Sequence, residues 1–538
     1  MNIPVSVTWV FNHPDKSCPN RVNNASPLMS YSVVWFKRDL RLHDHAALTA
    51  ALKHGPVLCL YIIEPSLWCA PDVSAQHYQF ILESLRELYI ELKQRGAILH
   101  VVTGEAVEVF QKIHQLNPFS ALFAHEETGN WLSFQRDLAI KSWTKNNKVN
   151  WKEFAQFGVV RCLKNHNLWK DNWDRHVSMT ILPSPMHIPS VDLPWQEPRS
   201  LTPFELGMDP LDPPQRQKGG RKNGLAVLDS FLSERSSQYR GGISSPLSAP
   251  TACSRVSPYL TYGCVSLREI VQATASQLAC LQPDDTRRNK GLNAFVSRLY
   301  WHCHFIQKME SEPELEFTNL HTGYDGLREN DWNEENFRAL TSAQTGWPLV
   351  DACVVMLRET GWLNFRMRAM LVSTAAYPLW LHWKEVGHWL ARNFLDYEPG
   401  IHWSQLQMQS GTTGINIPRI YNPIKQARDH DPRGVFVRRW LPALKKVPDT
   451  WLFEPWRMPE SLLQQHGLRS GQDIFQPRVE LDESTRVAKK KLFALRAQPE
   501  IKAGRASIVE KHASRKKSNK VSAKNKIQST THQQAFDF

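Results

Sequence analysis

The sequence predicts two folded parts: an α/β N-terminal domain built on a doubly wound, Rossmann-like parallel sheet, and an all-α C-terminal domain. Between residues 31 and 126, the short apolar runs YSVVWF, VLCLYII, AILHVV and ALFAHE alternate with helical patterns. Buried parallel strands joined by helices produce this alternation. From residue 224 onward the pattern becomes helical and rich in tryptophan. A length of 538 residues also exceeds the usual size of one domain, about 100–200 residues.

Composition divides the chain into six segments. Residues 1–30 form an N-terminal extension without a clear period, and the start is either Met1 or Met29. The α/β domain covers residues 31–164, with helical patterns at 45–53 and 76–96, and VNWKEFAQFGVV supplies its last strand near Phe154. The remaining segments are a Pro-, Asp- and Arg-rich surface connector (165–223), the helical domain (224–458), an exit segment (459–485) and a basic tail (486–538).

The positive charge of the chain is concentrated in the tail. The net charge is +13, and residues 486–538 hold 14 Lys and Arg against 3 Asp and Glu, so the tail carries 14 − 3 = +11 and the rest 13 − 11 = +2. The tail is polar and poor in aromatic residues, so we expect most of it to be disordered. It is either a solvated appendage or a sequence-nonspecific attachment to nucleic acid with salt-sensitive affinity.

Several classes of protein are excluded by composition. No apolar run approaches the roughly 20 residues that cross a bilayer, and the N-terminus lacks the order of a secretory signal. The nine cysteines are scattered and form no CxxC pair, which favours reduced cytoplasmic thiols and argues against zinc or iron–sulfur sites. We therefore expect no metal, no membrane association and a cytoplasmic location.

Residues 346–423 carry the strongest functional signal. Apolar residues recur there at helical spacing, but Arg366 and Arg368 interrupt one helix and Asp396 ends the next. A charge on an apolar helix face is costly to bury unless it is paired or meets a polar ligand. Considered alone, the block fits either a helical core whose arginines reach the surface or a binding site.

The order of the motifs resolves this choice. VVWFKRDLRLHDHAAL (33–48), TACSRVSPYLTYGCVS (251–266), FVSRLYWHCHFIQKM (295–309) and the block at 346–423 follow one another. This succession, over residues 31–458, resembles the DNA photolyase/cryptochrome family. The resemblance implies that the all-α domain binds FAD. It also implies that the α/β domain can hold an antenna chromophore, a folate or a deazaflavin, with neither preferred.

The resemblance assigns cofactor contacts to two regions. Around the diphosphate these are Tyr239, Cys253, Ser254, Arg255, Val256 and Ser257, and around the flavin ring they are Trp362, Arg368, Asp396, Tyr397, Glu398 and His402. Hydroxyl groups ahead of a helix can donate to a phosphate, although Ser254 or Ser257 could also be an ordinary N-cap. Cys253 replaces the usual threonine.

The same resemblance assigns DNA or substrate contacts to Arg298, Trp301, Phe365, Arg366, Met408 and Arg419. An aromatic ring at Trp301 could stack on an extruded base. Arg298 stands where the family has a glutamate, and Met408 where a second tryptophan is usual. The basic stretch from Lys425 to Arg439 is either a DNA contact or a solvated helix face.

Electron transfer and proton chemistry depart from the family pattern. Leu406 replaces the tryptophan nearest the flavin, whereas Trp383 matches the middle member of the electron relay and Trp332 the outer one. Trp403 offers another route into the relay. His402 replaces the usual asparagine beside the reactive ring nitrogen, where a histidine could titrate near neutrality. We assign Arg368, Asp396, His402, Trp383 and Trp332 to the catalytic set.

Two functions follow as hypotheses. The first is a deoxyribodipyrimidine photolyase-like enzyme, a carbon–carbon lyase that splits pyrimidine dimers by electron transfer from photoexcited reduced FAD. The second is a cryptochrome-like blue-light photoreceptor that binds FAD without repair, favoured by Arg298, Leu406 and Met408. We expect a monomer that binds damaged DNA without sequence preference. Asn364 and Phe365 argue against the (6-4) subtype, and the lack of any nicotinamide fingerprint argues against a light-independent flavin oxidoreductase.

Overall fold

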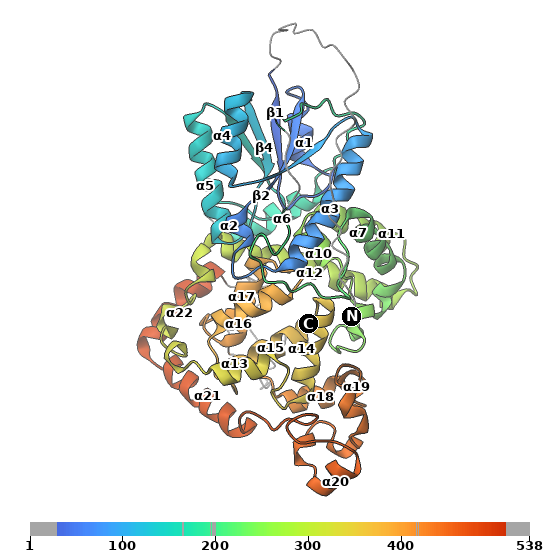
Figure 1. Cartoon of the computed structure of the whole chain (residues 1–538), viewed down its shortest axis with the longest axis vertical. Helices are drawn as coiled ribbons and strands as arrows, with labels where there is room; N and C mark the ends of the chain where they lie inside the picture. Colours follow the sequence, from blue (N-terminus) through green and yellow to red (C-terminus); the bar gives the residue numbers. More distant parts are fainter. Residues whose placement is uncertain are drawn as a thin grey trace, which may run out of the picture.

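The computed structural model describes residues 30–163, 166–193, 195, 201–415, 417 and 419–512. The predicted N-terminal extension and the choice between Met1 and Met29 lie outside the described residues. Within them, an α/β domain sits on a larger helical domain (Figure 1).

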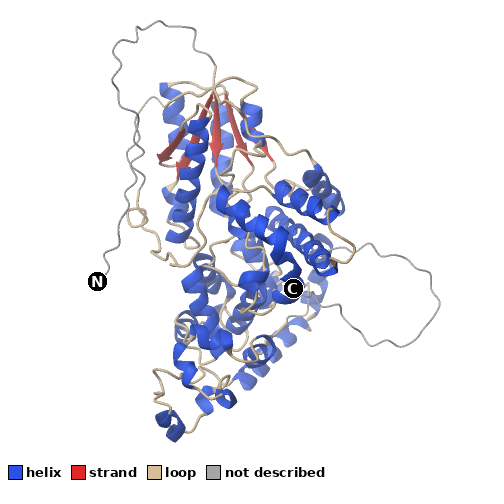
Figure 2. Cartoon of the chain, turned by 90° about the vertical axis from the view of Figure 1, so that its right-hand side faces the viewer, coloured by secondary structure: helices blue, strands red, loops and turns tan. Residues whose placement is uncertain are grey.

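The N-terminal domain contains a five-stranded parallel sheet in the order β3-β2-β1-β4-β5 (Figure 2). Its strands are β1 Ser32–Phe36, β2 Val57–Ile63, β3 Leu99–Thr103, β4 Ala121–His125 and β5 Asn150–Phe154. Strand order reverses between β1 and β4, and in open α/β sheets ligands bind beyond the carboxyl ends of the strands at such a point. The predicted doubly wound sheet is confirmed.

Helices cover both faces of this sheet. On one face α1 (Ala46–Ala51) and α3 (Ala75–Gln94) pack on Val34 and Phe36, and on the other α4 (Ala106–Leu116) and α5 (Trp131–Asn146) pack on Val33 and Trp35. Successive strand residues point to opposite faces, so both faces of β1 are apolar and buried. This explains why its sequence is a continuous apolar run.

The connector differs from the prediction of a surface segment. It contains α6 (Trp169–Ser178), whose Trp169, Trp173 and Val177 are buried in the core that continues into the helical domain. Three apolar residues at helical spacing mark this face, but the Pro- and Asp-rich surroundings obscured it.

In the helical domain the long helix α12 (Thr286–Ser311) packs against α17 (Pro399–Ser410). A Cβ atom on Gly400 would lie 2.6 Å from the Cα of Ile306, so only glycine permits this close approach of α17 to α12. The other α-helices are α2 Pro65–Trp68, α7 Arg221–Ser230, α8 Ser236–Gly242, α9 Ala249–Ala252, α10 Ser257–Thr261, α11 Leu267–Ala279, α13 Glu334–Thr341, α14 Pro348–Thr360, α15 Phe365–Ala376, α16 Trp383–Asn393, α18 Pro423–His430, α19 Val435–Trp440, α20 Glu460–Gln465, α21 Leu481–Arg496 and α22 Pro499–His512, with a π-helical turn at Phe231–Arg235.

The start of the basic tail is ordered, contrary to the prediction. Helices α21 and α22 run along the outside of the helical domain (Figure 1). Ala488, Leu492 and Ile501 are buried against Tyr324 and Tyr377. The polar composition of the segment hides this narrow apolar stripe, and only packing against the domain makes it stable. The tail beyond His512 lies outside the described residues.

Candidate functional site

A cavity of about 1060 Å³ lies between α8, α10, α12, α15 and α17. Its walls bring together many of the predicted site residues from distant parts of the sequence: Tyr239, Ser254, Val256, Ser257, Arg298, Phe365, Arg368, Asp396, Tyr397, Glu398, His402 and also Leu406. Cys253, Arg255, Trp362, Trp301, Arg366, Met408 and Arg419 are not among its lining residues. Many of the residues that the family resemblance assigned to the site thus lie on the cavity wall, and the others lie outside it.

Arg368 and Asp396, two of the predicted site residues, form an ion pair on one wall. Nη2 of Arg368 donates to Oδ2 of Asp396 at 3.0 Å, and its Nε donates to the carbonyl of Leu363 at 2.8 Å. The guanidinium also lies 4.1 Å from the ring centroid of Phe394. Oδ1 of Asp396 also lies 3.0 Å from Nη2 of Arg368, so one guanidinium nitrogen faces both carboxylate oxygens. Each carboxylate oxygen can accept more than one hydrogen bond, which suits a ligand that brings an N–H group.

The segment from Ser254 to Ser257, beside the cavity, carries a positive charge at Arg255. The Arg255 guanidinium lies 4.0 Å from the ring centroid of Trp362 and donates to Oε1 of Gln217. Burial lowers the pKa of Arg255 to about 10, so it remains charged at neutral pH. The backbone of Arg255 has φ +63°, a left-handed conformation that is uncommon for a non-glycine residue. Together with the Ser254 and Ser257 hydroxyls, Arg255 suits an anionic ligand such as a diphosphate.

Glu398 is held by the other domain. Its Oε2 accepts from Nη2 of Arg38 at 2.9 Å, while Oε1 is buried without a hydrogen bond. Burial raises the pKa of Glu398 to about 7, and Arg38 opposes this shift. Sequence reasoning placed Arg38 in the charged motif that follows β1 but missed this contact, because nothing local connects residues 360 positions apart.

His402 differs from the prediction of a group that titrates near neutrality. It is buried, and its Nε2 is 2.9 Å from the carbonyl of Gly387, which fixes the proton on Nε2. Burial lowers the pKa of His402 to about 3, so the ring is neutral at physiological pH. The unprotonated Nδ1 can accept a hydrogen bond but has no proton to give.

The predicted DNA and substrate residues separate into two groups. Arg298 and Phe365 line the cavity and are half-buried. Met408 instead lines a second, smaller space of about 270 Å³ together with Lys308, and Trp301 lies against Phe305 with ring centroids 5.7 Å apart. Arg366 is half-buried and Arg419 is exposed. The structure thus brings only Arg298 and Phe365 to the cavity wall.

Two of the tryptophans assigned to the electron relay, Trp403 and Trp383, are in contact behind His402. The ring centroid of Trp403 is 5.0 Å from His402 and 5.9 Å from Trp383, and both tryptophans are buried. Nε1 of Trp383 donates to Oδ1 of Asn319 at 2.8 Å. Trp332 is half-buried beside Phe337. Trp403 lies close to Leu406, since both side chains border Gly387. An indole is therefore present near the position where the family's first relay tryptophan is missing.

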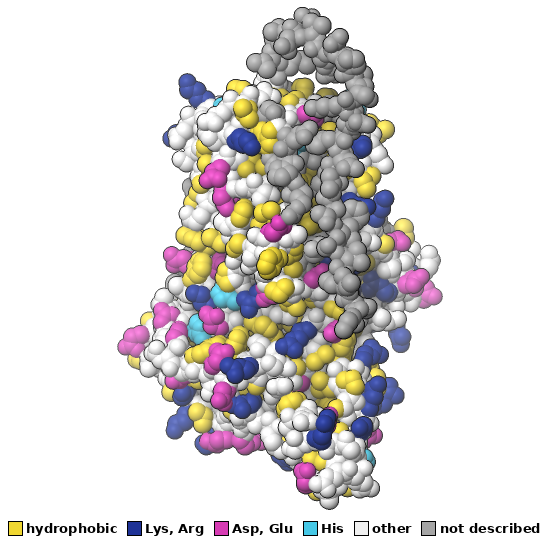
Figure 3. All heavy atoms as spheres, viewed as in Figure 1, with side chains coloured by type: hydrophobic (Ala, Val, Ile, Leu, Met, Phe, Trp, Pro, Cys, Tyr) yellow, Lys and Arg dark blue, Asp and Glu magenta, His cyan; other side chains and the backbone are white. Residues whose placement is uncertain are grey.

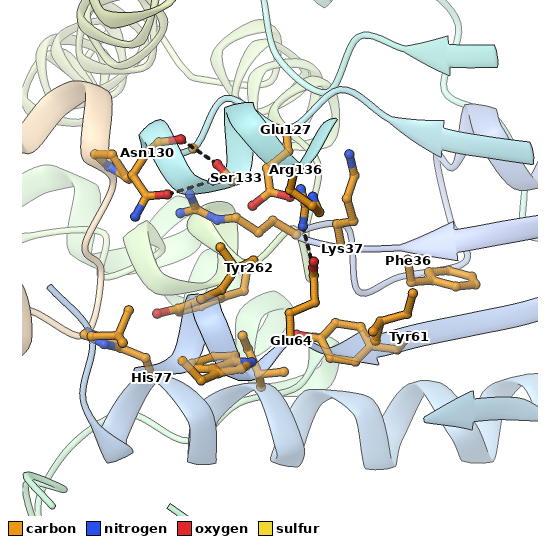
Figure 4. Close-up of a pocket in the computed structure, with 18 of the residues that line it drawn as sticks. Phe36, Lys37, Tyr61, Glu64, His77, Glu127, Asn130, Ser133, Arg136 and Tyr262 are labelled. Carbon is orange, nitrogen blue, oxygen red and sulfur yellow. Dashed lines mark hydrogen bonds and ion pairs between the residues drawn. The ribbon is translucent and has the colours of Figure 1, made fainter. Parts of the chain in front are cut away.

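A separate cavity of about 790 Å³ lies where the two domains meet (Figure 4). It is lined by aromatic rings, including Trp35, Tyr61 and Tyr262, and by Arg136, which pairs with Glu64 at 2.7 Å and Glu127 at 2.5 Å. Tyr397 lines both this cavity and the larger one. A single side chain thus contributes to the walls of both.

One buried cluster could be mistaken for a metal site. Asp39, His45 and His125 present ligand atoms within 4.8 Å of one another. Oδ2 of Asp39 is 2.7 Å from Nδ1 of His125 and 3.0 Å from Nε2 of His45, and Nδ1 of His45 accepts from the Leu48 N–H. The His45 proton therefore lies on Nε2, the nitrogen nearer Asp39. The cluster is a buried hydrogen-bond network that follows β1.

The fold and the larger cavity define a photolyase-type flavoprotein, and comparison with known proteins agrees. Residues 295–494 match the FAD-binding domain of DNA photolyase, and residues 32–164 match the DNA photolyase domain. The chain belongs to the DNA photolyase/cryptochrome family and binds FAD. The Glu398 oxygen that is buried without a hydrogen bond, and the lining arginines Arg298 and Arg368, are compatible with this cofactor.

Relatives carry both functional names. A cryptochrome DASH from Gloeobacter violaceus is 28% identical over 480 residues, covering 84% of this chain and 93% of the relative. A deoxyribodipyrimidine photo-lyase from Alkalihalophilus pseudofirmus is 25% identical over 486 residues, covering 84% and 95%. A crystal structure of a class III photolyase from Agrobacterium tumefaciens superposes with a TM-score of 0.76 at 23% identity, covering 89% of this chain and all of that one. Among the described helices, none has the length and apolar character needed to cross a bilayer.

Proposed function

We propose that this protein is a light-driven DNA repair enzyme that splits pyrimidine dimers, a deoxyribodipyrimidine photolyase-like lyase. In the sequence alone Arg298 favoured a photoreceptor, but it shares the wall of the flavin cavity with Phe365, and this shared placement is the observation that carries the repair proposal. A cation and an aromatic ring beside a redox cofactor suit a flipped base, which needs a stacking surface and polar contacts to its edge.

When bound, reduced FAD supplies the electron that splits the dimer after it absorbs light. Extrusion of the lesion from the duplex costs a few kcal/mol, less for a damaged pair. The positive charge of Arg298 lowers the energy of negative charge that develops on the bound base. Arg368 and Asp396 hold the cofactor's polar edge, and neutral His402 offers it an acceptor.

Affinity for DNA comes from local arginines and from the tail. On the face drawn in Figure 3, basic and acidic side chains are interspersed over the helical domain. Residues 1–485, which exclude the basic segment, carry a net charge of only +2, in agreement with this mixture. Arg366, Arg419 and the tail would contact phosphates, which attracts DNA without reading its sequence.

A repair assay tests the proposal. Protein loaded with reduced FAD is mixed with dimer-containing single- and double-stranded DNA, in blue light and in darkness. We expect dimers to disappear only in the light. If both substrates keep their dimers, the photolyase function is excluded, while retention of FAD would leave the flavin site intact.

The second candidate is a blue-light photoreceptor without repair activity. The position of Met408 outside the flavin cavity favours it, because the second ring that would clamp a dimer is missing from that wall. The same assay separates the two functions: a photoreceptor would respond to light with a change in flavin absorption but leave every dimer in place.

We further propose that the interdomain cavity takes an antenna chromophore, a folate or a deazaflavin, and that the protein works in the cytoplasm as a monomer. The aromatic walls of that cavity suit a planar ring system. Chromophores extracted from the purified protein and separated by chromatography identify the antenna. Gel filtration with light scattering gives the number of subunits.

A further inference from the structure

Tyr397 forms a short hydrogen bond across the two domains. Its hydroxyl donates to Oδ2 of Asp72 at 2.6 Å, and both side chains are buried. Asp72 comes from the N-terminal domain, just before α3. Its Oδ2 also accepts from Asn130 at 3.1 Å, whereas its Oδ1 is buried without a hydrogen bond. A phenol and an incompletely satisfied carboxylate thus meet inside the protein.

Tyr397 connects this pair to the flavin cavity. Tyr397 is on the cavity wall, and its ring centroid is 5.1 Å from that of His402, another wall residue. Leu406, also on the wall, has a saturated hydrocarbon side chain that cannot donate an electron to a flavin. Tyr397 is therefore a redox-active side chain on a wall where the position usually used for electron donation is inert.

The hydrogen bonds continue from Tyr397 to the two contacting tryptophans. Nε1 of Trp403 donates to the Tyr397 hydroxyl oxygen at 3.1 Å, and the Trp403 ring centroid is 5.9 Å from that of Trp383. The phenol thus stands between the cavity and the two indoles. An electron that leaves Tyr397 can be replaced from Trp403 or from outside the protein.

Oxidation of a buried phenol requires a place for its proton. A charged phenol radical in an apolar interior would be very costly, as is any buried unpaired charge. A carboxylate at 2.6 Å can accept the proton without any movement of heavy atoms. Burial, followed by the negative charge of Asp72, raises the pKa of the Tyr397 phenol well above its ordinary value, so the phenol is protonated before light arrives.

We propose that Tyr397 is the immediate electron donor to the light-excited oxidised flavin, and that Asp72 accepts its phenolic proton. The O–H bond of Tyr397 breaks, one electron passes to the flavin, and the proton moves to Oδ2 of Asp72. The products are a neutral tyrosyl radical and a neutral aspartic acid. A thiol reductant in solution then supplies one electron, and Asp72 returns the proton. The inference rests on flavin binding and does not require dimer repair.

The test uses the full-length FAD-loaded protein under anaerobic blue light. Transient absorption and electron paramagnetic resonance should detect a neutral tyrosyl radical that appears together with flavin reduction. The resonance signal of the wild type should change when the protein contains ring-deuterated tyrosine and stay unchanged with ring-deuterated tryptophan. The opposite labelling result would overturn the proposal without reference to any variant.

Variants then separate the donor from the proton acceptor. Tyr397→Phe should abolish the tyrosyl signal and slow flavin reduction roughly tenfold or more, the change expected from a barrier difference of about 1.4 kcal/mol. Because the donation includes a proton transfer, wild-type flavin reduction should be slower in deuterated water. Asp72→Asn keeps a side chain of similar shape but cannot take a proton, so the tyrosyl yield should fall and this slowing should disappear. An unchanged rate and radical in both variants would show that Tyr397 is not the donor.

Tyr259→Phe is the matched control. Tyr259 is buried too, but its hydroxyl donates to the backbone carbonyl of Lys218 at 2.9 Å, a group that cannot accept a proton. Its removal should leave the rate and the radical unchanged. Flavin absorption measures cofactor content in every sample. Folded protein without flavin would overturn the flavin site and this proposal together, whereas flavin that is reduced without a tyrosyl radical would overturn this proposal alone.

Discussion

Arg38, two residues beyond β1, pairs with Glu398, which precedes α17, at 2.9 Å. Arg38 lines the interdomain cavity and Glu398 lines the flavin cavity, so their ion pair forms part of the partition between the two. The same guanidinium donates to the carbonyls of Thr261 and Tyr397. One side chain of the α/β domain therefore organises a wall of the cofactor site in the other domain.

Glu398 should make stability depend on pH. Burial raises its folded-state pKa to about 7, above the ordinary value of 4.5. The contribution of Glu398 to the free energy of unfolding is therefore fully present below the pKa of the unfolded chain and is lost as pH rises through about 7. Glu398→Gln should remove this slope, a difference of at most about 3 kcal/mol in the free energy of unfolding. Urea unfolding of flavin-free wild type and variant across this range measures it, and parallel pH profiles would contradict it.

Loss of the Arg368–Asp396 ion pair should release FAD. In Asp396→Asn the guanidinium of Arg368 loses its charged partner, and a charge-assisted hydrogen bond is worth about 1.5–3 kcal/mol. We expect FAD affinity to fall at least about tenfold, measured by flavin absorbance after gel filtration. Arg428→Ala, which removes an exposed pair with Glu454, is the control and should retain FAD. Equal retention in both variants would argue against a cofactor role for the pair.

His402 should not titrate in the physiological range. Burial lowers its pKa to about 3, so the ring stays neutral as pH falls toward acid. Nuclear magnetic resonance of the histidine ring protons, assigned with His402→Asn, should show a signal for His402 that does not move across neutral pH. A midpoint near 6.5, the ordinary histidine value, would contradict the buried, neutral ring.

Trp383 should support light-driven reduction of the flavin. Leu406 stands where the family has the tryptophan nearest the flavin. We therefore expect electrons from a reductant in solution to reach the site through Trp383 and Trp403. Trp383→Phe should slow bleaching of oxidised FAD under blue light with a thiol present. Trp389→Phe, on the same helix α16 and also buried, is the matched control. Identical bleaching in all three proteins would show that electrons take another route.

The end of the tail should raise DNA affinity without sequence preference. Truncation after Thr485 would also remove buried Leu492 and Ile501, so the better cut follows His512. It removes six Lys and Arg and one Asp, a change of 6 − 1 = 5 charges. Binding should weaken on all sequences, and the slope of log affinity against log salt should fall by about 0.9 for each phosphate that the shortened chain no longer neutralises. An unchanged slope would make these residues irrelevant to DNA.

Local patterns predicted a large part of this molecule. The apolar runs located β1 to β4, because a buried parallel strand shows a continuous apolar signal in the sequence itself. The edge strand β5, NWKEF, is mixed in polarity and partly exposed, and it was located from the segment VNWKEFAQFGVV. Motif order indicated the cavity walls and the Arg368–Asp396 pair. The structure differs from the sequence prediction at His402, whose buried ring is neutral, and it puts Met408 beside a separate space and not on the flavin cavity wall.

The sequence by itself determined the fold class, the family and the flavin cavity, since these depend on periodicity and on motifs that lie within short stretches. Only the tertiary structure decided that α21 and α22 are ordered, that His402 is neutral and that Arg38 reaches Glu398. It alone joined Tyr397 to Asp72, which are 325 positions apart. The physical reason is that burial and long-range hydrogen bonds arise from packing between domains, and no local pattern encodes which distant group a side chain will meet.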